Sequence, residues 1–167
     1  MMKLRAFLLL FPLVVPVFAQ TPPPITPYAE LTRVTKSVTT LNTSWQFGLH
    51  TVSREYNEPY MRPGAGPRPK QMSDNLVEEL AGIERNDAGL YQDFSPAIQK
   101  AHADAIAQMK LTPNQIAADT AAFNQANTQA QASTPIASLV TDTPNPQRFA
   151  AMADYLANLL KQLGDYK

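Results

Sequence analysis

The chain has 167 residues, no cysteine, and 14 basic against 14 acidic side chains. This length suits one domain, and the lack of cysteine excludes disulfides, thiol nucleophiles and cysteine-ligated metals. The balanced charge argues against a protein that binds nucleic acid through electrostatic attraction.

Residues 1–19 predict a secretory signal peptide. Basic residues near the start precede an apolar stretch of about ten residues, and Ala19 suits cleavage before Gln20. The stretch is interrupted by Pro12 and Pro16 and is shorter than the roughly 20 residues that span a bilayer. We therefore expect export to the periplasm or the extracellular space, and no transmembrane segment in the mature chain. The mature chain is mildly acidic because it loses two basic residues.

A long helix is predicted from Pro27. Thr26 suits the N-cap and a proline suits the first helical position, whereas residues 20–26 predict an extended, proline-rich lead. Apolar side chains then recur every three or four residues, close to the helical period of about 3.6. They are Leu31, Val34, Val38, Leu41, Trp45, Leu49, Val52 and Tyr56. Residues 57–59 are expected to end this helix because they include a proline.

The middle of the chain predicts a loop and two further helices. Prolines and glycines concentrate in residues 57–72, which argues against regular structure there. Ser73 suits the start of a second helix, and residues 86–89 suit its end or a kink. Ser95 followed by Pro96 suits the start of a third helix.

A capping box predicts the start of the next helix. Thr112 precedes Gln115 by three residues, and the residue after Thr112 is a proline. No large apolar residue lies between Phe123 and Ile136. We therefore expect the segment 124–133 to be mobile, or to be ordered by a partner, because it cannot bury much apolar surface.

The C-terminal part predicts a short turn after Pro135, a break at residues 143–146 and a last helix over 149–163, which Gly164 ends. The apolar residues of this helix follow a clean helical spacing and are Phe149, Met152, Leu156, Leu159, Leu160 and Leu163.

The predicted fold class is all-α, because alternating runs of β-branched residues, which are typical of strands, are missing. We expect a helical bundle of about four main helices plus one or two short ones. A single helical domain is predicted over residues 27–167, with a long first helix and the proline-rich loop 57–72.

Candidate binding residues fall in two groups. Phe47, His50 and Arg54 are spaced to share one face of the first helix. The loop combines aromatic and basic side chains, namely Tyr60, Arg62, Arg68 and Lys70. Such loops bind partners disproportionately often, so we predict a contact surface here. The alternatives are that the aromatic ring of Phe47 packs under the loop and that the loop is a solvated linker.

The sequence favours a non-enzymatic protein over an enzyme. The usual catalytic motifs are missing, and we predict no catalytic residue, no metal and no cofactor. His102 lies one turn from Ile98, on the side of its helix that faces the core. It is either a metal ligand or acid–base group inside the bundle, or a boundary histidine with an ordinary hydrogen-bond partner. Bundle metal sites use Glu-x-x-His pairs, and here Gln99 occupies the position of the glutamate.

Two short stretches resemble known families. The sequence Leu111–Gln115 resembles the Leu-Thr-x-x-Gln motif of small helical periplasmic stress chaperones, and it coincides with the capping box. Residues 38–42, together with the export signal and the Ala/Thr-rich helices, resemble fungal hydrophobic-surface-binding cell-wall proteins. The first resemblance implies a chaperone-like role and the second a structural one. Neither carries over the role of a particular residue.

The leading functional prediction is an exported, non-enzymatic helical protein that binds a protein partner or an amphipathic surface outside the cytoplasm. Two alternatives stay open. One is a structural envelope or cell-wall protein that binds hydrophobic surfaces, and the other is a metal-binding or enzymatic bundle that uses His102. No nucleic-acid partner is expected.

Overall fold

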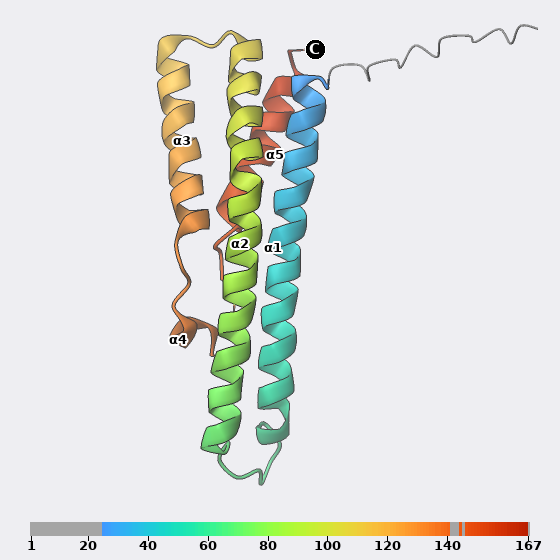
Figure 1. Cartoon of the computed structure of the whole chain (residues 1–167), viewed down its shortest axis with the longest axis vertical. Coiled ribbons are helices and arrows are strands. Elements are labelled where there is room, and N and C mark those ends of the chain that lie inside the picture. Colours follow the sequence, from blue (N-terminus) through green and yellow to red (C-terminus); the bar gives the residue numbers. More distant parts are fainter. Residues whose placement is uncertain (1–24, 141–143, 145, 167) are drawn as a thin grey trace, which may run out of the picture.

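The computed structural model describes residues 25–140, 144 and 146–166, and in this part of the chain it contains helices and no strand (Figure 1). The proposed signal peptide, residues 20–24 of the lead, and residues 143 and 145 of the expected break lie outside the described residues. The elements are α1 (Pro27–Asn57), η1 (Glu58–Tyr60), α2 (Lys70–Met109), α3 (Pro113–Gln131), α4 (Ile136–Leu139) and α5 (Ala150–Gly164). The predicted all-α bundle, with four substantial helices, is confirmed.

Helix α1 confirms the predicted long helix. The hydroxyl of Thr26 accepts a hydrogen bond from the backbone N–H of Ala29, and Pro27 occupies the first helical position. Its 31 residues span about 46 Å, and the side chains of the predicted apolar stripe, from Leu31 to Leu49, are buried. The helix ends at Asn57, as the sequence predicts.

Helix α2 corrects the prediction of two helices separated at Ser95 and Pro96. It is one helix of 40 residues, it begins at Lys70 rather than Ser73, and it contains Pro96. The proline removes one backbone hydrogen bond, which costs about 3 kcal/mol in a helix interior. Pro96 and Gln92, whose carbonyl loses its partner, are both exposed, so water can bind that carbonyl. The helix continues because its buried stripe, which includes Tyr91 and Ile98, runs through the proline without a shift.

The connection between α1 and α2 is shorter than the expected loop 57–72. Asn57 is the last residue of α1, η1 follows it directly, and Lys70 is already helical. The irregular stretch therefore covers residues 61–69. It includes Gly64, whose φ of 82° lies in the left-handed region that glycine adopts without strain.

Helix α3 begins with the predicted capping box. The Thr112 hydroxyl accepts a hydrogen bond from the backbone N–H of Gln115, and the Gln115 side chain accepts one from the backbone N–H of Thr112. Helix α3 then continues as regular helix to Gln131, through most of the segment 124–133. Its buried side chains are few and mostly small, namely Phe123, Ala126 and Ala130. The expected lack of tight apolar packing is thus visible, while the mobility of this segment stays a prediction.

Helix α5 confirms the predicted last helix and ends at Gly164. Its buried side chains include Met152, Leu156, Leu159 and Leu163, and Phe149 directly before the helix is fully buried. The short α4, which follows Pro135, buries Leu139.

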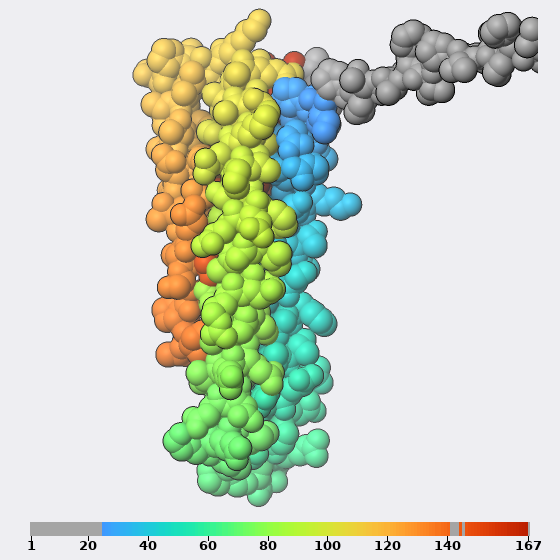
Figure 2. Space-filling view, viewed as in Figure 1, coloured from blue at the N-terminus to red at the C-terminus, as the bar shows by residue number. Residues whose placement is uncertain are grey.

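The helices alternate in direction. Trp45 of α1 contacts Phe149 with ring centroids 5.1 Å apart, and Gly164 at the other end of α5 lies beside Tyr28. Helix α5 therefore runs antiparallel to α1 and covers only the half of the α1–α2 hairpin that contains residues 28–45. The other half, residues 50–76, extends past α3 and α5 and is called the tip below (Figure 1). Figure 2 shows this end of the molecule built from the end of α1, the connection and the start of α2.

A buried polar cluster, called the Arg148 cluster below, joins α2, the end of α3 and the segment before α5. The Arg148 guanidinium pairs with Glu84 and donates from Nε to the Ala130 carbonyl at 2.9 Å. The backbone N–H of Thr134 donates to Glu84 Oε1 at 2.8 Å. The two charged side chains of the pair are almost fully buried, so the C-terminal end of α3 is held by charge and hydrogen bonds.

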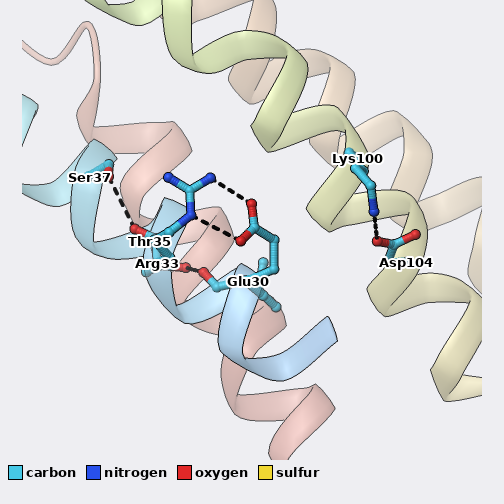
Figure 3. A network of polar contacts seen from close by, with 7 residues as sticks. Glu30, Arg33, Thr35, Ser37, Lys100 and Asp104 are labelled. Carbon is cyan, nitrogen blue, oxygen red and sulfur yellow. Dashed lines mark hydrogen bonds and ion pairs between the residues drawn. The ribbon is translucent and has the colours of Figure 1, made fainter. Parts of the chain in front are cut away.

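The outer faces of α1 and α2 carry exposed ion pairs. Arg33 donates two hydrogen bonds to Glu30, at 2.6 and 3.0 Å, and Lys100 contacts Asp104 at 2.6 Å (Figure 3). The hydrogen bond from Arg33 lowers the pKa of Glu30. Exposed pairs of this kind contribute at most about 1 kcal/mol each, so packing between the helices dominates the stability.

Within the described residues, no helix is both long and apolar enough to cross a bilayer.

Candidate functional site at the tip

The tip carries a hollow of about 720 Å³. It is lined by His50, Arg54, Asn57, Glu58, Met61, Arg62 and Pro63. The first three of these come from the last two turns of α1, and the others come from η1 and the start of the connection. The hollow forms because the proline-rich connection continues α1 with a short 3₁₀ turn and then leaves the helix axis. A volume in this range is typical of binding clefts.

Three of the predicted site residues meet at this hollow. His50 and Arg54 are one turn apart on α1, and Arg62 reaches the same hollow from the connection. Phe47 lies one turn before His50 on the outer face of α1, and 72% of its side chain is exposed. The alternative that Phe47 packs under the loop is therefore wrong.

The charges around the hollow are mixed. Arg54 contacts Glu58 at 3.4 Å, but both side chains are mostly exposed, so water screens this pair. No ion pair of the Arg62 side chain is found within the described residues. Arg62 can therefore turn its guanidinium to an anionic group on a partner, and such a bond is charge-assisted.

Asn57 supplies an unusual polar group at the hollow. Its side-chain amide N–H donates to Ser53 Oγ at 3.1 Å, but its carbonyl Oδ1 is buried and has no hydrogen-bond partner among the described residues. The residue is only 3% exposed. A buried acceptor without a partner costs about 1–3 kcal/mol, so Asn57 lowers the stability of this end of α1.

The remaining predicted residues lie apart from the hollow. The Arg68 guanidinium lies over the Tyr60 ring, 5.9 Å from its centroid, and Lys70 contacts Asp74 at 2.6 Å in the first turn of α2. These three side chains interact within the hairpin itself. We therefore assign them to the shape of the connection rather than to the binding surface.

A cross-helix hydrogen bond supports the tip where α3 and α5 do not reach it. The Tyr56 hydroxyl of α1 donates to Glu79 of α2 at 2.6 Å, and this hydrogen bond raises the pKa of Tyr56. Leu49 and Leu76 are fully buried between the two helices. The hollow is thus carried by a two-helix support whose buried leucines continue the main core of the bundle.

His102 is far from the tip and has an ordinary partner. Its Nε2 lies 2.6 Å from Asp119 Oδ2, and its ring stacks on Phe123 with centroids 4.2 Å apart. The described residues contain no group of three or more His, Asp or Glu side chains that could hold a metal ion. This arrangement matches the interpretation of a boundary histidine with a side-chain partner.

Sequence reasoning missed Asn57 and Met61 at the hollow. Asn57 belongs to the helix stop, and Met61 is exposed by 64% in the connection, where no periodic pattern exists. An exposed methionine next to the predicted aromatic and basic residues was a signal that could have found it.

No protein-family model matches the chain, and no curated protein or solved structure matches it. The interpretation of the tip therefore depends on its own residues.

Proposed function

We propose that the chain is an exported, non-enzymatic binding protein that docks a protein partner through its tip. The observation that carries the proposal is the hollow at the tip, whose lining brings the guanidinium-bearing residues Arg54 and Arg62 together beside the exposed Met61. Two exposed guanidinium groups are complementary to a ligand that offers anionic oxygens.

A peptide segment with an acidic side chain has this chemistry. Its carboxylate pairs with Arg62 and lies near Arg54. Phe47 and Met61 flank these polar groups with exposed apolar surface of the kind that protein interfaces favour. A purely apolar surface offers no anionic partner to Arg54 and Arg62, so the observations favour a protein over an amphipathic interface.

Export rests on residues 1–19 alone. The positive start, the short apolar stretch and the small residues before Gln20 are the support for it. The intact mass of the protein recovered from the extracellular or periplasmic fraction tests this part. A chain that begins at Gln20 is the expected result, and a full-length chain retained in the cell contradicts it.

Docking is tested by site-specific photo-crosslinking in the native extracellular or periplasmic fraction. A photoreactive residue at Met61 is expected to capture a defined protein. The same group at Ala157, which is exposed on α5, is the matched control and is expected to capture none. The double variant Arg54→Ala/Arg62→Ala, with the photoreactive group still at position 61, should lose most of the captured product.

Two results contradict the docking proposal. One is equal capture from positions 61 and 157, which indicates contact without a preferred surface. The other is undiminished capture by the double variant, because the proposed carboxylate contact then contributes nothing. A thermal unfolding midpoint equal to that of the wild type ensures that the variant is folded.

A further inference from the structure

A second cleft lies between α3 and α5, in the half of the molecule opposite the tip. Its volume is about 340 Å³. It is lined by Leu111, Gln115, Ala118, Asp119, Ala122, Tyr155, Asn158, Leu159 and Gln162. Asp119 is the one residue of this lining that carries a charge at neutral pH, so the cleft contains a single negative charge among apolar and amide groups.

The Asp119 carboxylate is held in place from two neighbouring helices. Its Oδ2 lies 2.6 Å from Nε2 of His102 on α2, and its Oδ1 accepts a hydrogen bond of 2.8 Å from the hydroxyl of Tyr155 on α5. His102 is fixed in turn by its stacking on Phe123. The side chains of His102 and Asp119 are only 13% and 16% exposed. The charge therefore cannot swing out into solvent without breaking these contacts.

The carboxylate has acceptor capacity that these two contacts leave unused. A carboxylate offers about four lone-pair positions, and among the described residues each oxygen of Asp119 has one hydrogen-bond partner. Burial, together with the hydrogen bond to Asp119, raises the pKa of Tyr155, so the Tyr155 hydroxyl stays protonated and keeps donating to Asp119. The Tyr155 ring forms part of the cleft wall, and an aromatic face attracts cations.

We infer that the α3–α5 cleft binds a small organic ammonium compound, whose charged nitrogen contacts Asp119 and whose apolar body contacts Leu111, Leu159 and the Tyr155 ring. Anionic ligands are excluded by the fixed negative charge. Neutral ligands gain only the apolar contacts. This site is separate from the tip, so its failure or success leaves the docking proposal unaffected.

The test is a titration of the protein with benzylammonium, followed by two-dimensional NMR. Saturable shifts are expected in the amides of residues 115–122 and 155–162, with a dissociation constant in roughly the millimolar range. Benzyl alcohol is the neutral probe of similar shape. Benzyl alcohol should bind at least about tenfold more weakly than benzylammonium, because it forms no charge-assisted hydrogen bond with Asp119.

Two variants locate the binding. Asp119→Asn should weaken benzylammonium binding by about tenfold or more, while Asp104→Asn, which removes an exposed carboxylate of α2, should leave it unchanged. Ala122→Leu fills the cleft and leaves Asp119, His102 and Tyr155 intact, so it should abolish binding. Ala122→Leu therefore still tests the inference if Asp119→Asn does not fold.

Three results overturn the inference. They are the absence of saturable shifts, equal affinity for benzylammonium and benzyl alcohol, and undiminished binding by Ala122→Leu. Each would indicate that Asp119 only links the three helices.

Discussion

Helices α3 and α5 are held in the bundle in different ways: α5 packs mainly against α1, and α3 packs mainly against α5. Helix α5 buries large apolar side chains, including Met152, Leu156 and Leu159. Helix α3 buries one large side chain, Phe123, and is otherwise attached by polar contacts. Asp119 links its first half to α2 and α5, and the Arg148 cluster holds its end.

This difference determines how each helix responds to change. The stabilisation from apolar burial is spread over many atoms, so one substitution removes only part of it. A buried ion pair depends on both partners being present. We therefore expect α3 to be the more easily detached helix, although the two helices lie in contact with each other.

The largest effect is expected from Arg148→Met. The substitution leaves Glu84 buried without its partner and frees the Ala130 carbonyl, so it should lower the free energy of unfolding by about 3–5 kcal/mol. Urea denaturation measures this change. Arg33→Met, which breaks an exposed pair, is the control and should cost less than about 1 kcal/mol. Adding Glu84→Gln to Arg148→Met should recover part of the loss. A loss for Arg148→Met as small as that of the control would contradict a polar attachment of α3.

Leu156→Ala probes the apolar attachment of α5. Leu156 is fully buried, so its truncation should lower the free energy of unfolding by about 3 kcal/mol through lost burial and the cavity left behind. Ile116→Ala on α3 removes a side chain that is 40% exposed and should cost clearly less. Equal losses in the same denaturation experiment would show that the two helices do not differ in apolar packing.

Thr112→Ala probes the start of α3. The Thr112 hydroxyl accepts a hydrogen bond from the backbone N–H of Gln115, and losing such a cap costs about 1 kcal/mol. The loss should appear as faster amide exchange in the first turns of α3, with α5 unaffected. Equal acceleration in both helices would mean that α3 does not open separately.

Asp87→Asn should have the smallest effect, and it should be pH-dependent. Burial raises the pKa of Asp87 above its ordinary value in the folded state. Ionisation of Asp87 therefore destabilises the folded state. This loss of stability begins as the pH rises through the ordinary pKa and is complete above the folded-state pKa. Thermal unfolding should show Asp87→Asn to be stabilised at neutral pH and unchanged in acid. The exposed Asp93→Asn is the control, and a stabilisation of Asp87→Asn that persists in acid would rule out this origin.

Much of the fold could be predicted because its signals are local. The spacing of apolar residues from Leu31 to Tyr56 and over 149–163 predicts two helices, and the capping box predicts a third. The continuity of α2 through Pro96 could not be predicted, because it depends on which side of the helix faces solvent. The pairing of Glu84 with Arg148 joins residues 64 positions apart and leaves no trace in a local pattern.

The candidate site was predictable to a similar degree. The spacing of Phe47, His50 and Arg54 places them on one face, and Arg62 joins His50 and Arg54 at the hollow. The aromatic and basic residue types also recur at Tyr60, Arg68 and Lys70, but these side chains contact other residues of the hairpin. Whether such a residue reaches the hollow depends on the path of the connection, which the sequence pattern does not give. The α3–α5 cleft depends on three helices meeting at Asp119, so sequence reasoning found His102 without its partners.

Amide hydrogen exchange under native conditions tests the difference between α3 and α5 most directly. The account predicts that the amides of residues 124–131 exchange at a clearly lower free energy of opening than those of residues 150–163. Uniform strong protection across both helices would contradict it, because α3 would then open only when the whole bundle unfolds.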